Sequence, residues 1–330
     1  MSSQPFHYIG KDYDFLAPLA CGDVAAEGMD LRLERSTDTM AGGAAQVRFL
    51  ASPEIASGEY SFSLYLIGLS RGDRQFIGIP FFPARGFRHH CIYVRSDSGL
   101  RCAKDLEGKR IGLNAWKTTG NTWTRAALRE EGADLSGMSW VVGPMDGSGR
   151  DAAHNKPQVD LPESVRPAPP GETLESMLLD GALDAVMCPA PPPSFGDGSG
   201  RTARLYQDHR RTERDYYART RIYPAHHLVV VRRDVFERSP RAAIQLYSAL
   251  ETSRQWWQAR RRGLAETTPW MEDEIAEATQ VFGGDWQVNG VQPNMTLIET
   301  LCREQHLQGL VKRQVDPAEV FAEFGRIAQT

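Results

Sequence analysis

The chain has 330 residues, of which 41% are hydrophobic and 24% are charged. This length suits two compact lobes, and the composition is that of a folded globular protein, which excludes a disordered chain. With 38 basic and 42 acidic residues the formal charge is -4, so no overall field favours nucleic acid. Any anion site must therefore come from local clusters of basic residues.

Cysteine spacing and hydropathy exclude further classes. No CxxC pair is present, so we expect reduced thiols and no zinc site at the five scattered cysteines, Cys21, Cys91, Cys102, Cys188 and Cys302. The first residues lack a basic start followed by an apolar run, and no window approaches the roughly 18 apolar residues of a membrane span. We expect a cytoplasmic protein without a membrane or nucleic-acid partner.

Short apolar runs separated by turn residues predict the elements of the first part of the chain. Strands are expected at 6–9, 29–33, 76–80 and 89–94, with a helix at 15–20. The run 60–68 fits either a strand or a helix, and a Pro-Gly loop precedes the strand at 89–94.

A second alternation of strands and helices begins near residue 97. Strands are expected at 111–113, 139–142 and 183–187, helices at 122–131 and 172–180, and a long connection between 143 and 172. A strongly β-branched strand at 222–233 then precedes helices at 239–262 and 270–281. This order, without a repeat of fixed period, predicts the α/β class.

The strongest basic cluster lies beside the predicted strand at 89–94. Arg85, Arg88, His89 and His90 fall within six residues. Arginine offers a planar fork of donors that matches a carboxylate, and histidine transfers protons near neutral pH. On a strand His89 and His90 would face opposite sides, so only one would reach a ligand. A solvated basic turn is the alternative interpretation.

A second histidine pair and an acidic residue are the other candidates for proton transfer. His226 and His227 lie on the predicted strand at 222–233, where alternation again lets one face a ligand, and a hydrogen-bonded core histidine is the alternative. Asp14 follows the first strand, where α/β sheets place ligands, and could orient a histidine or accept a phenol proton. Because no HxH or HxxxH spacing occurs, we expect no metal.

Neutral polar residues provide two further candidate binding groups. Thr118 and Thr119 precede a predicted helix, whose free N–H groups and dipole favour an anion, although simple capping is the alternative. Ser61, Ser63 and Tyr65 would share one face of a strand and could bind ring hydroxyls, although ordinary alternation explains them equally well.

Common nucleophile and nucleotide motifs do not occur in the sequence. There is no GxSxG elbow, no phosphate loop and no dinucleotide fingerprint. Cys91 falls inside the predicted apolar strand at 89–94, which disfavours a reactive thiol.

One long motif carries a family resemblance. The run from Gly78 to Gly99, GIPFFPARGFRHHCIYVRSDSG, resembles the signature of the 4,5-dihydroxyphthalate decarboxylase family. Further similar positions extend the resemblance from about residue 8 to residue 321, among them DLEGKRIG at 105–112, Thr119, Trp123, Arg125, Tyr223-Pro224, His227, Pro269-Trp270 and Asp285-Trp286.

The resemblance implies both a fold and a reaction. The fold would be the type II periplasmic-binding-protein architecture, with a ligand cleft between lobe one, residues 1–95 and 225–330, and lobe two, residues 96–224. The reaction would be a cofactor-independent decarboxylation of a small hydroxylated aromatic or related carboxylic acid. His89 or His227 would be the acid, and Arg85, Arg88 and the Thr118-Thr119 helix end would hold a carboxylate.

Three departures from the family pattern bear on specificity. Ala190 stands where the family usually has arginine, Asn289 where it has tyrosine, and Phe15-Leu16 where it has Arg-Thr. A substrate other than a phthalate is therefore compatible with the sequence. The alternatives are a binding protein that captures a small anion without chemistry, and another lyase such as a dehydratase. The sequence is also compatible with a homo-oligomer.

Overall fold

A computed structural model describes residues 5–37, 43–148 and 161–329. The chain divides into two compact units. Unit 1 takes residues up to 85, residues 225–302 and residues from 313 onward, and unit 2 takes 86–224 and 303–312. Residues 86–95 and 303–312 therefore lie in unit 2, although the expected lobes placed them in the first.

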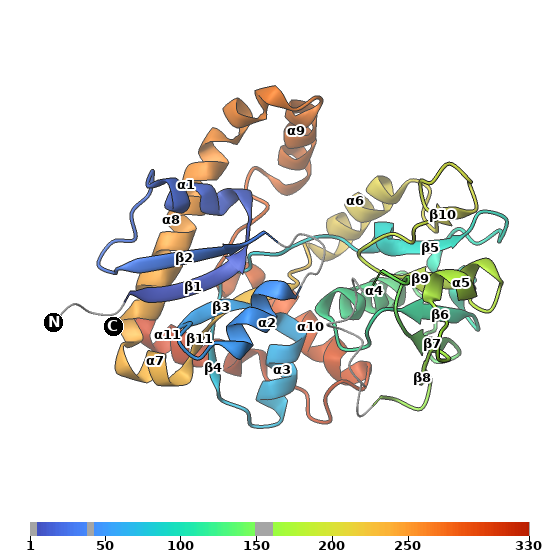
Figure 1. The fold of residues 1–330 in the computed structure, drawn as a ribbon, viewed down its shortest axis with the longest axis horizontal. Helices are drawn as coiled ribbons and strands as arrows, with labels where there is room; N and C mark the ends of the chain where they lie inside the picture. Colours follow the sequence, from blue (N-terminus) through green and yellow to red (C-terminus); the bar gives the residue numbers. More distant parts are fainter. Residues whose placement is uncertain (1–4, 38–42, 149–160, 330) are drawn as a thin grey trace. The chain divides into compact units, whose positions relative to one another are not determined.

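Unit 1 contains a five-stranded mixed sheet in the order β2-β1-β3-β11-β4 (Figure 1). Strands β1 and β2 are parallel, as are β1 and β3, whereas β11 runs antiparallel to both β3 and β4. The strands are β1 Phe6–Lys11, β2 Leu31–Ser36, β3 Ser57–Ser61, β4 Phe76–Ile79 and β11 His227–Arg232. The helices are α1 Ala17–Cys21, α2 Ala44–Ala51, α3 Phe62–Ser70, α7 Arg233–Arg238, α8 Pro240–Leu264, α9 Met271–Phe282, α10 Met295–Leu307, which crosses into unit 2, and α11 Ala322–Ala328.

Strand β11 shows why this sheet forms. Leu228, Val229, Val230 and Val231 are all fully buried, as expected for a strand covered on both faces, and their branched side chains favour the pleated conformation. The long helix α8 packs against α1, α7 and α11, and supplies Leu246 and other residues to the core of unit 1 (Figure 1).

Unit 2 contains a six-stranded mixed sheet in the order β10-β5-β9-β6-β7-β8. Strand β5 is antiparallel to β9 and β10, whereas β6 is parallel to β7 and β9. The strands are β5 Ile92–Arg95, β6 Arg110–Leu113, β7 Ser139–Val142, β8 Val165–Pro167, β9 Ala185–Met187 and β10 Thr202–Arg204. The helices are α4 Thr119–Glu130, α5 Leu174–Leu179 and α6 His209–Thr220.

The pairing of β5 explains why residues 86–95 belong to unit 2. Its partners β9 and β10 both lie in that unit, and Tyr93 packs in the unit 2 core with Leu174, Leu178 and Val186. No helix in the described ranges is long and apolar enough to cross a membrane.

Most predicted elements are confirmed, but several local predictions are wrong, and the strand predicted at 222–233 begins only at His227. The strand predicted at 89–94 begins only at Ile92, because His89–Cys91 form a 3-10 turn. The connection predicted between 143 and 172 contains strand β8, which is too short to show a clear period, while its residues 149–160 lie outside the described ranges.

Candidate functional site

The sheet of unit 1 brings His227 and Glu59 together. Strands β11 and β3 pair so that His227 stands opposite Ser61 and Val229 stands opposite Glu59. Glu59 is thus the diagonal cross-strand neighbour of His227, within reach on the same face. The Nδ1 atom of His227 hydrogen-bonds to Oε1 of Glu59. The Glu59 side chain is 4% exposed and that of His227 is 23% exposed.

Two further donors fix the Glu59 carboxylate. Its Oε2 atom accepts a hydrogen bond from the Lys11 amide at 2.8 Å, and its Oε1 atom accepts one from the Tyr13 hydroxyl at 2.7 Å. Burial opposes the charge, but His227 and these hydrogen bonds hold the pKa of Glu59 below its usual value. Burial and the nearby carboxylate raise the pKa of Tyr13, so its hydroxyl stays a donor.

This arrangement assigns the protons of His227. An ionised carboxylate only accepts hydrogen bonds, so the Nδ1 atom of His227 must donate to Glu59. The other ring nitrogen, Nε2, is then the atom that can exchange a proton with a ligand, and the carboxylate stabilises the ring when it is protonated. His227 is therefore arranged in a way that suits proton transfer.

Glu59 is the residue of this candidate site that the sequence interpretation missed. It lies between Gly58 and Tyr60, and the polar start of β3 concealed the strand, so the expected apolar run began only at Tyr60. A glutamate is almost never buried without a partner. Once the strand is recognised, a glutamate within it therefore indicates a paired carboxylate. Asp14, the predicted acidic group, instead accepts a hydrogen bond from the Phe15 amide at 2.9 Å, and burial raises its pKa.

The predicted shared strand face of Ser61, Ser63 and Tyr65 is wrong. Strand β3 ends at Ser61, whose hydroxyl accepts a hydrogen bond from the Leu64 amide at the start of α3. Ser63 and Tyr65 therefore lie in a helix, where residues two apart point in different directions.

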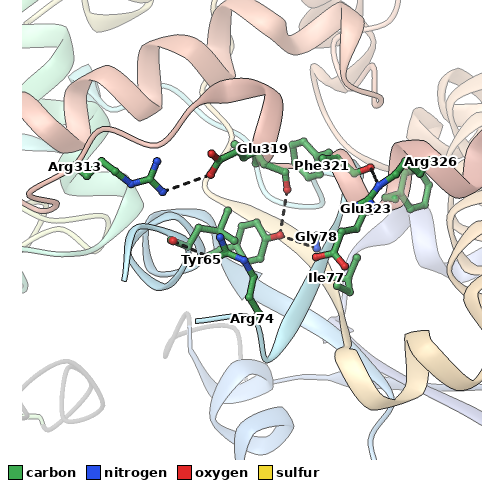
Figure 2. A pocket seen from close by; sticks show the side chains of 13 residues that line it. Tyr65, Arg74, Ile77, Gly78, Arg313, Glu319, Phe321, Glu323 and Arg326 are labelled. Carbon is green, nitrogen blue, oxygen red and sulfur yellow. Dashed lines mark hydrogen bonds and ion pairs between the residues drawn. The ribbon is translucent and has the colours of Figure 1, made fainter. Parts of the chain in front are cut away.

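Tyr65 has a packing role in the structure. Its hydroxyl donates to the Val320 carbonyl at 3.1 Å and accepts from the Gly78 amide at 2.9 Å, and burial raises its pKa to about 12. This side chain lines a pocket of about 450 Å³ within unit 1. Arg74, Arg313 and Glu319 also line this pocket, as Figure 2 shows.

Arg85 and His226 are also placed within unit 1. The Nη2 atom of Arg85 donates to the Val288 carbonyl at 2.8 Å and to Oδ1 of Asn294 at 2.7 Å, so part of its fork is occupied. His226 is buried, unlike His227, and its amide donates to the Ala84 carbonyl at 2.8 Å.

In unit 2 the two adjacent histidines have different surroundings. His89 is 2% exposed and packs against the rings of Tyr206 and Tyr216. Its Nε2 atom lies 3.3 Å from Oε1 of Glu131, without the geometry of a hydrogen bond. The surroundings differ because the 3-10 turn, and not strand alternation, directs the side chains.

His90 forms an ion pair with a helix residue. Its Nδ1 atom lies 2.7 Å from Oε1 of Glu213 on α6. Burial works against the charged ring, but the Cys91 thiol and the Glu213 carboxylate raise the pKa of His90 to about 9. Burial likewise opposes the charge of Glu213, whose pKa is nevertheless lowered by His90. His90 is therefore a cation at neutral pH.

Arg88 lies against the first turn of α4. A Cβ atom added at Gly120 would come within 3.2 Å of its guanidinium group, so glycine permits this close approach. In the described part of the chain the buried Nε atom of Arg88 has no hydrogen-bond partner. Thr118 caps the helix without a side-chain hydrogen bond, and Thr119 is buried in the first turn. An arginine beside a helix N-terminus is a suitable carboxylate site.

The described residues contain no group of three or more histidine, cysteine, aspartate or glutamate side chains arranged to hold a metal ion.

No protein-family profile matches the chain. Two curated relatives do. The chain is 31% identical to 4,5-dihydroxyphthalate decarboxylase of Comamonas testosteroni over 318 residues, covering 94% of both chains. It is 40% identical to 4,5-dihydroxyphthalate decarboxylase of Pseudomonas putida over 162 residues, covering 48% of this chain and 62% of the relative.

Solved structures are similar in fold. The periplasmic aliphatic sulphonate binding protein SsuA of Escherichia coli matches with a TM-score of 0.55 at 13% identity, covering 96% of this chain and 97% of that protein. The alkanesulfonate-binding protein SsuA of Xanthomonas axonopodis pv. citri matches with a TM-score of 0.54 at 15% identity, covering 97% and 99%. At these identities the similarity establishes the periplasmic-binding-protein fold, as expected from the sequence.

Proposed function

The chain belongs to the 4,5-dihydroxyphthalate decarboxylase family, and from this premise we propose that it removes one carboxyl group from a small hydroxylated aromatic acid, with 4,5-dihydroxyphthalate as the first substrate to test. The observation that supports a role for this chain's own residues is the His227–Glu59 pair. A partly exposed histidine held by a buried, ionised carboxylate is suited to proton transfer.

The chemistry of the substrate defines what the acid must do. In 4,5-dihydroxyphthalate each carboxyl-bearing carbon has a hydroxyl group para to it, so oxygen electrons can stabilise the ring while that carbon takes a proton. The ring electron pair forms the new C–H bond. The C–C bond to the carboxylate then breaks, its electron pair returns to the ring, and carbon dioxide leaves. The product is 3,4-dihydroxybenzoate.

We assign the proton transfer to Nε2 of His227 and the orientation of its ring to Glu59. General acid catalysis supplies roughly 10²- to 10⁴-fold in rate, so positioning and electrostatic stabilisation must supply the remainder. In unit 2, Arg88 with the start of α4 is the proposed carboxylate-binding group, because its Nε donor is buried and unpaired among the described residues.

We also propose that the protein acts in the cytoplasm. All five cysteines are free thiols in the structure, which agrees with a reducing compartment.

The experiment is turnover of 4,5-dihydroxyphthalate in deuterated buffer, following carbon dioxide release and the product by NMR. We expect 3,4-dihydroxybenzoate with one deuterium on the carbon that lost its carboxylate. His227→Gln should lose this activity, whereas His306→Gln, at an exposed position of α10, should keep it. Tight binding without carbon dioxide release would contradict the proposal and favour a binding protein. Release of water from related hydroxylated acids would make the protein a dehydratase.

A further inference from the structure

Two buried cysteines of unit 2 are backbone neighbours beside a pair of strands: Cys91 directly precedes β5, and Cys188 directly follows β9. Ile92 of β5 pairs with Met187 of β9 in an antiparallel register, and Cys91 and Cys188 are the next residues beyond this pair. The Cys188 amide donates to the Cys91 carbonyl at 3.0 Å. Opposite residues of an antiparallel pair have Cα atoms about 4.5–5.5 Å apart. That separation lies within the range of disulfides.

Both cysteines lie close to Tyr93. Tyr93 lies in β5, two residues after Cys91, which is the last residue of the preceding 3-10 turn. Burial raises the pKa of Tyr93 to about 12, and both Cys91 and Cys188 contribute to this increase. Cys188 and Tyr93 also pack in the same core cluster. Both cysteines are thus neighbours of the same tyrosine.

Cys91 has the surroundings of a reactive thiol. The Nη1 atom of Arg88 lies 3.7 Å from the Sγ atom of Cys91. His90, which pairs with Glu213, is the residue directly before Cys91 in the chain. Burial opposes ionisation of the Cys91 thiol, but His90 and Arg88 lower its pKa below the usual range. The thiolate is the reactive form of cysteine. Cys91 also lies in a 3-10 turn and not inside the apolar strand where the sequence placed it.

We propose that Cys91 and Cys188 are a peroxide-sensitive dithiol, in which Cys91 is oxidised first and Cys188 then closes a disulfide. The Cys91 thiolate attacks hydrogen peroxide, the O–O bond breaks, and the departing hydroxide takes a proton to leave as water. The Cys188 sulfur then attacks the sulfenic acid, the S–O bond breaks, and a second water carries away the thiol proton. Two thiols and one peroxide thus give one disulfide and two waters.

Burial restricts which oxidant can act. Cys91 and Cys188 are each 1% exposed, so a reagent of the size of hydrogen peroxide is favoured over a bulky aromatic disulfide. Cys21 and Cys102 are exposed and should react first with a bulky reagent. Arg88 also belongs to the proposed carboxylate site, but the test below does not depend on the decarboxylation, because it counts thiols and not turnover.

The test is to treat the full-length protein with hydrogen peroxide, denature it, alkylate the remaining thiols and determine the intact mass and the proteolytic peptides. Untreated protein should carry five labels, one for each cysteine. Oxidised protein should carry three labels and yield a peptide that joins Cys91 to Cys188, and a reductant should restore five. Oxidation of Cys91 without this peptide, or a disulfide to another cysteine, would overturn the proposal.

Three variants separate the two steps. In Cys188→Ala the reaction should stop at the Cys91 sulfenic acid, which a 1,3-dicarbonyl reagent traps. Cys102→Ser, at an exposed cysteine, should form the disulfide as the parent does. His90→Asn should slow oxidation of Cys91 roughly three- to tenfold, because it removes a charge that stabilises the thiolate. An unchanged rate in His90→Asn would contradict the assignment of Cys91 as the first thiol.

Discussion

Each unit pairs a histidine with a glutamate, but the pairs are built differently. In unit 1 His227 and Glu59 come from adjacent strands of one sheet, and the carboxylate has two further donors, the Lys11 amide and the Tyr13 hydroxyl. In unit 2 His90 lies on a 3-10 turn and meets Glu213 on α6, with its side chain 36% exposed. The first pair is fixed by strand register and the second by the packing of a helix.

This difference assigns different tasks to the two histidines. Burial lowers the pKa of His90, but Cys91 and Glu213 raise it more, to about 9. The ring therefore keeps its proton at neutral pH. The best general acid has a pKa near the working pH, so His90 suits holding an anion better than proton transfer. His227, whose Nδ1 proton is donated to Glu59, is the acid that we propose.

The largest expected effect follows from neutralising Glu59. Glu59→Gln keeps the size of the side chain but removes the charge that supports a protonated His227 and fixes its Nδ1 proton. We expect kcat to fall roughly 10²- to 10⁴-fold with a small change in KM. Steady-state kinetics on protein whose fold is verified by circular dichroism is the measurement. Retention of full kcat would remove unit 1 as the site of proton transfer.

Tyr13→Phe is the graded control for that prediction. It removes one of the hydrogen bonds to the Glu59 carboxylate and leaves His227 untouched. The loss of one such bond corresponds to about 1.5–3 kcal/mol, so kcat should fall roughly ten- to hundredfold, which is less than in Glu59→Gln. An equal loss in both variants would indicate a general disturbance of the sheet.

Arg88 tests unit 2 in the same assay. Arg88→Gln removes the proposed carboxylate donor, and we expect KM to rise roughly ten- to hundredfold while kcat changes little. Arg88→Lys should recover only part of the affinity, because a point charge does not reproduce the planar fork. Arg201→Gln, at an exposed arginine, is the matched control. A fall in kcat at unchanged KM would mean that Arg88 acts in the chemical step.

The fold was largely predictable because its core segments carry strong periodic signals. The apolar run that becomes β11 and the long helix α8 are examples, and the strand at 139–142 matches β7 residue for residue. The prediction failed at His89–Cys91, because an apolar run does not reveal whether its first residues form a turn or join the strand. The same ambiguity hid the change from strand to helix after Ser61.

The site was less predictable than the fold. His227 was a candidate from its place on a β-branched strand, but its partner Glu59 is 168 residues away in the chain. Their contact depends on the register of β3 against β11, which local sequence does not encode. Similarly, Arg88 lies against Gly120 through the packing of α4, and local sequence does not encode that contact.

His89 is the other candidate acid, and its burial predicts a packing role that a substitution can test. It is buried among aromatic rings and both of its ring nitrogens lack a hydrogen-bond partner among the described residues. His89→Phe should therefore keep kcat and change the free energy of unfolding by less than about 1.5 kcal/mol. His89→Ala should lower it by about 3 kcal/mol through the cavity it leaves. Urea unfolding and turnover measure both, and a hundredfold loss of kcat in His89→Phe would make His89 the acid instead.

The smallest expected effect is the pH dependence of the His90–Glu213 pair. The pKa of His90 is higher in the folded protein, about 9, than in the unfolded chain, near 6.5, so its stabilising effect is complete below about pH 6.5 and is lost as the pH rises through about 9. The pKa of Glu213 is lowered by folding, so its effect is present above about pH 4.5 and is lost in acid.

The free-energy difference between the parent and Glu213→Gln should therefore be greatest at mildly acidic pH and decline on both sides. Solvent screening of the partly exposed His90 limits it to under about 1 kcal/mol. Urea unfolding of both proteins across this pH range is the measurement, with Glu237→Gln, at an exposed helix position, as the control. A difference that does not change with pH would show that the carboxylate acts through packing. His90 would then lose its assignment as a fixed cation, and the contrast between the two histidines would rest on burial alone.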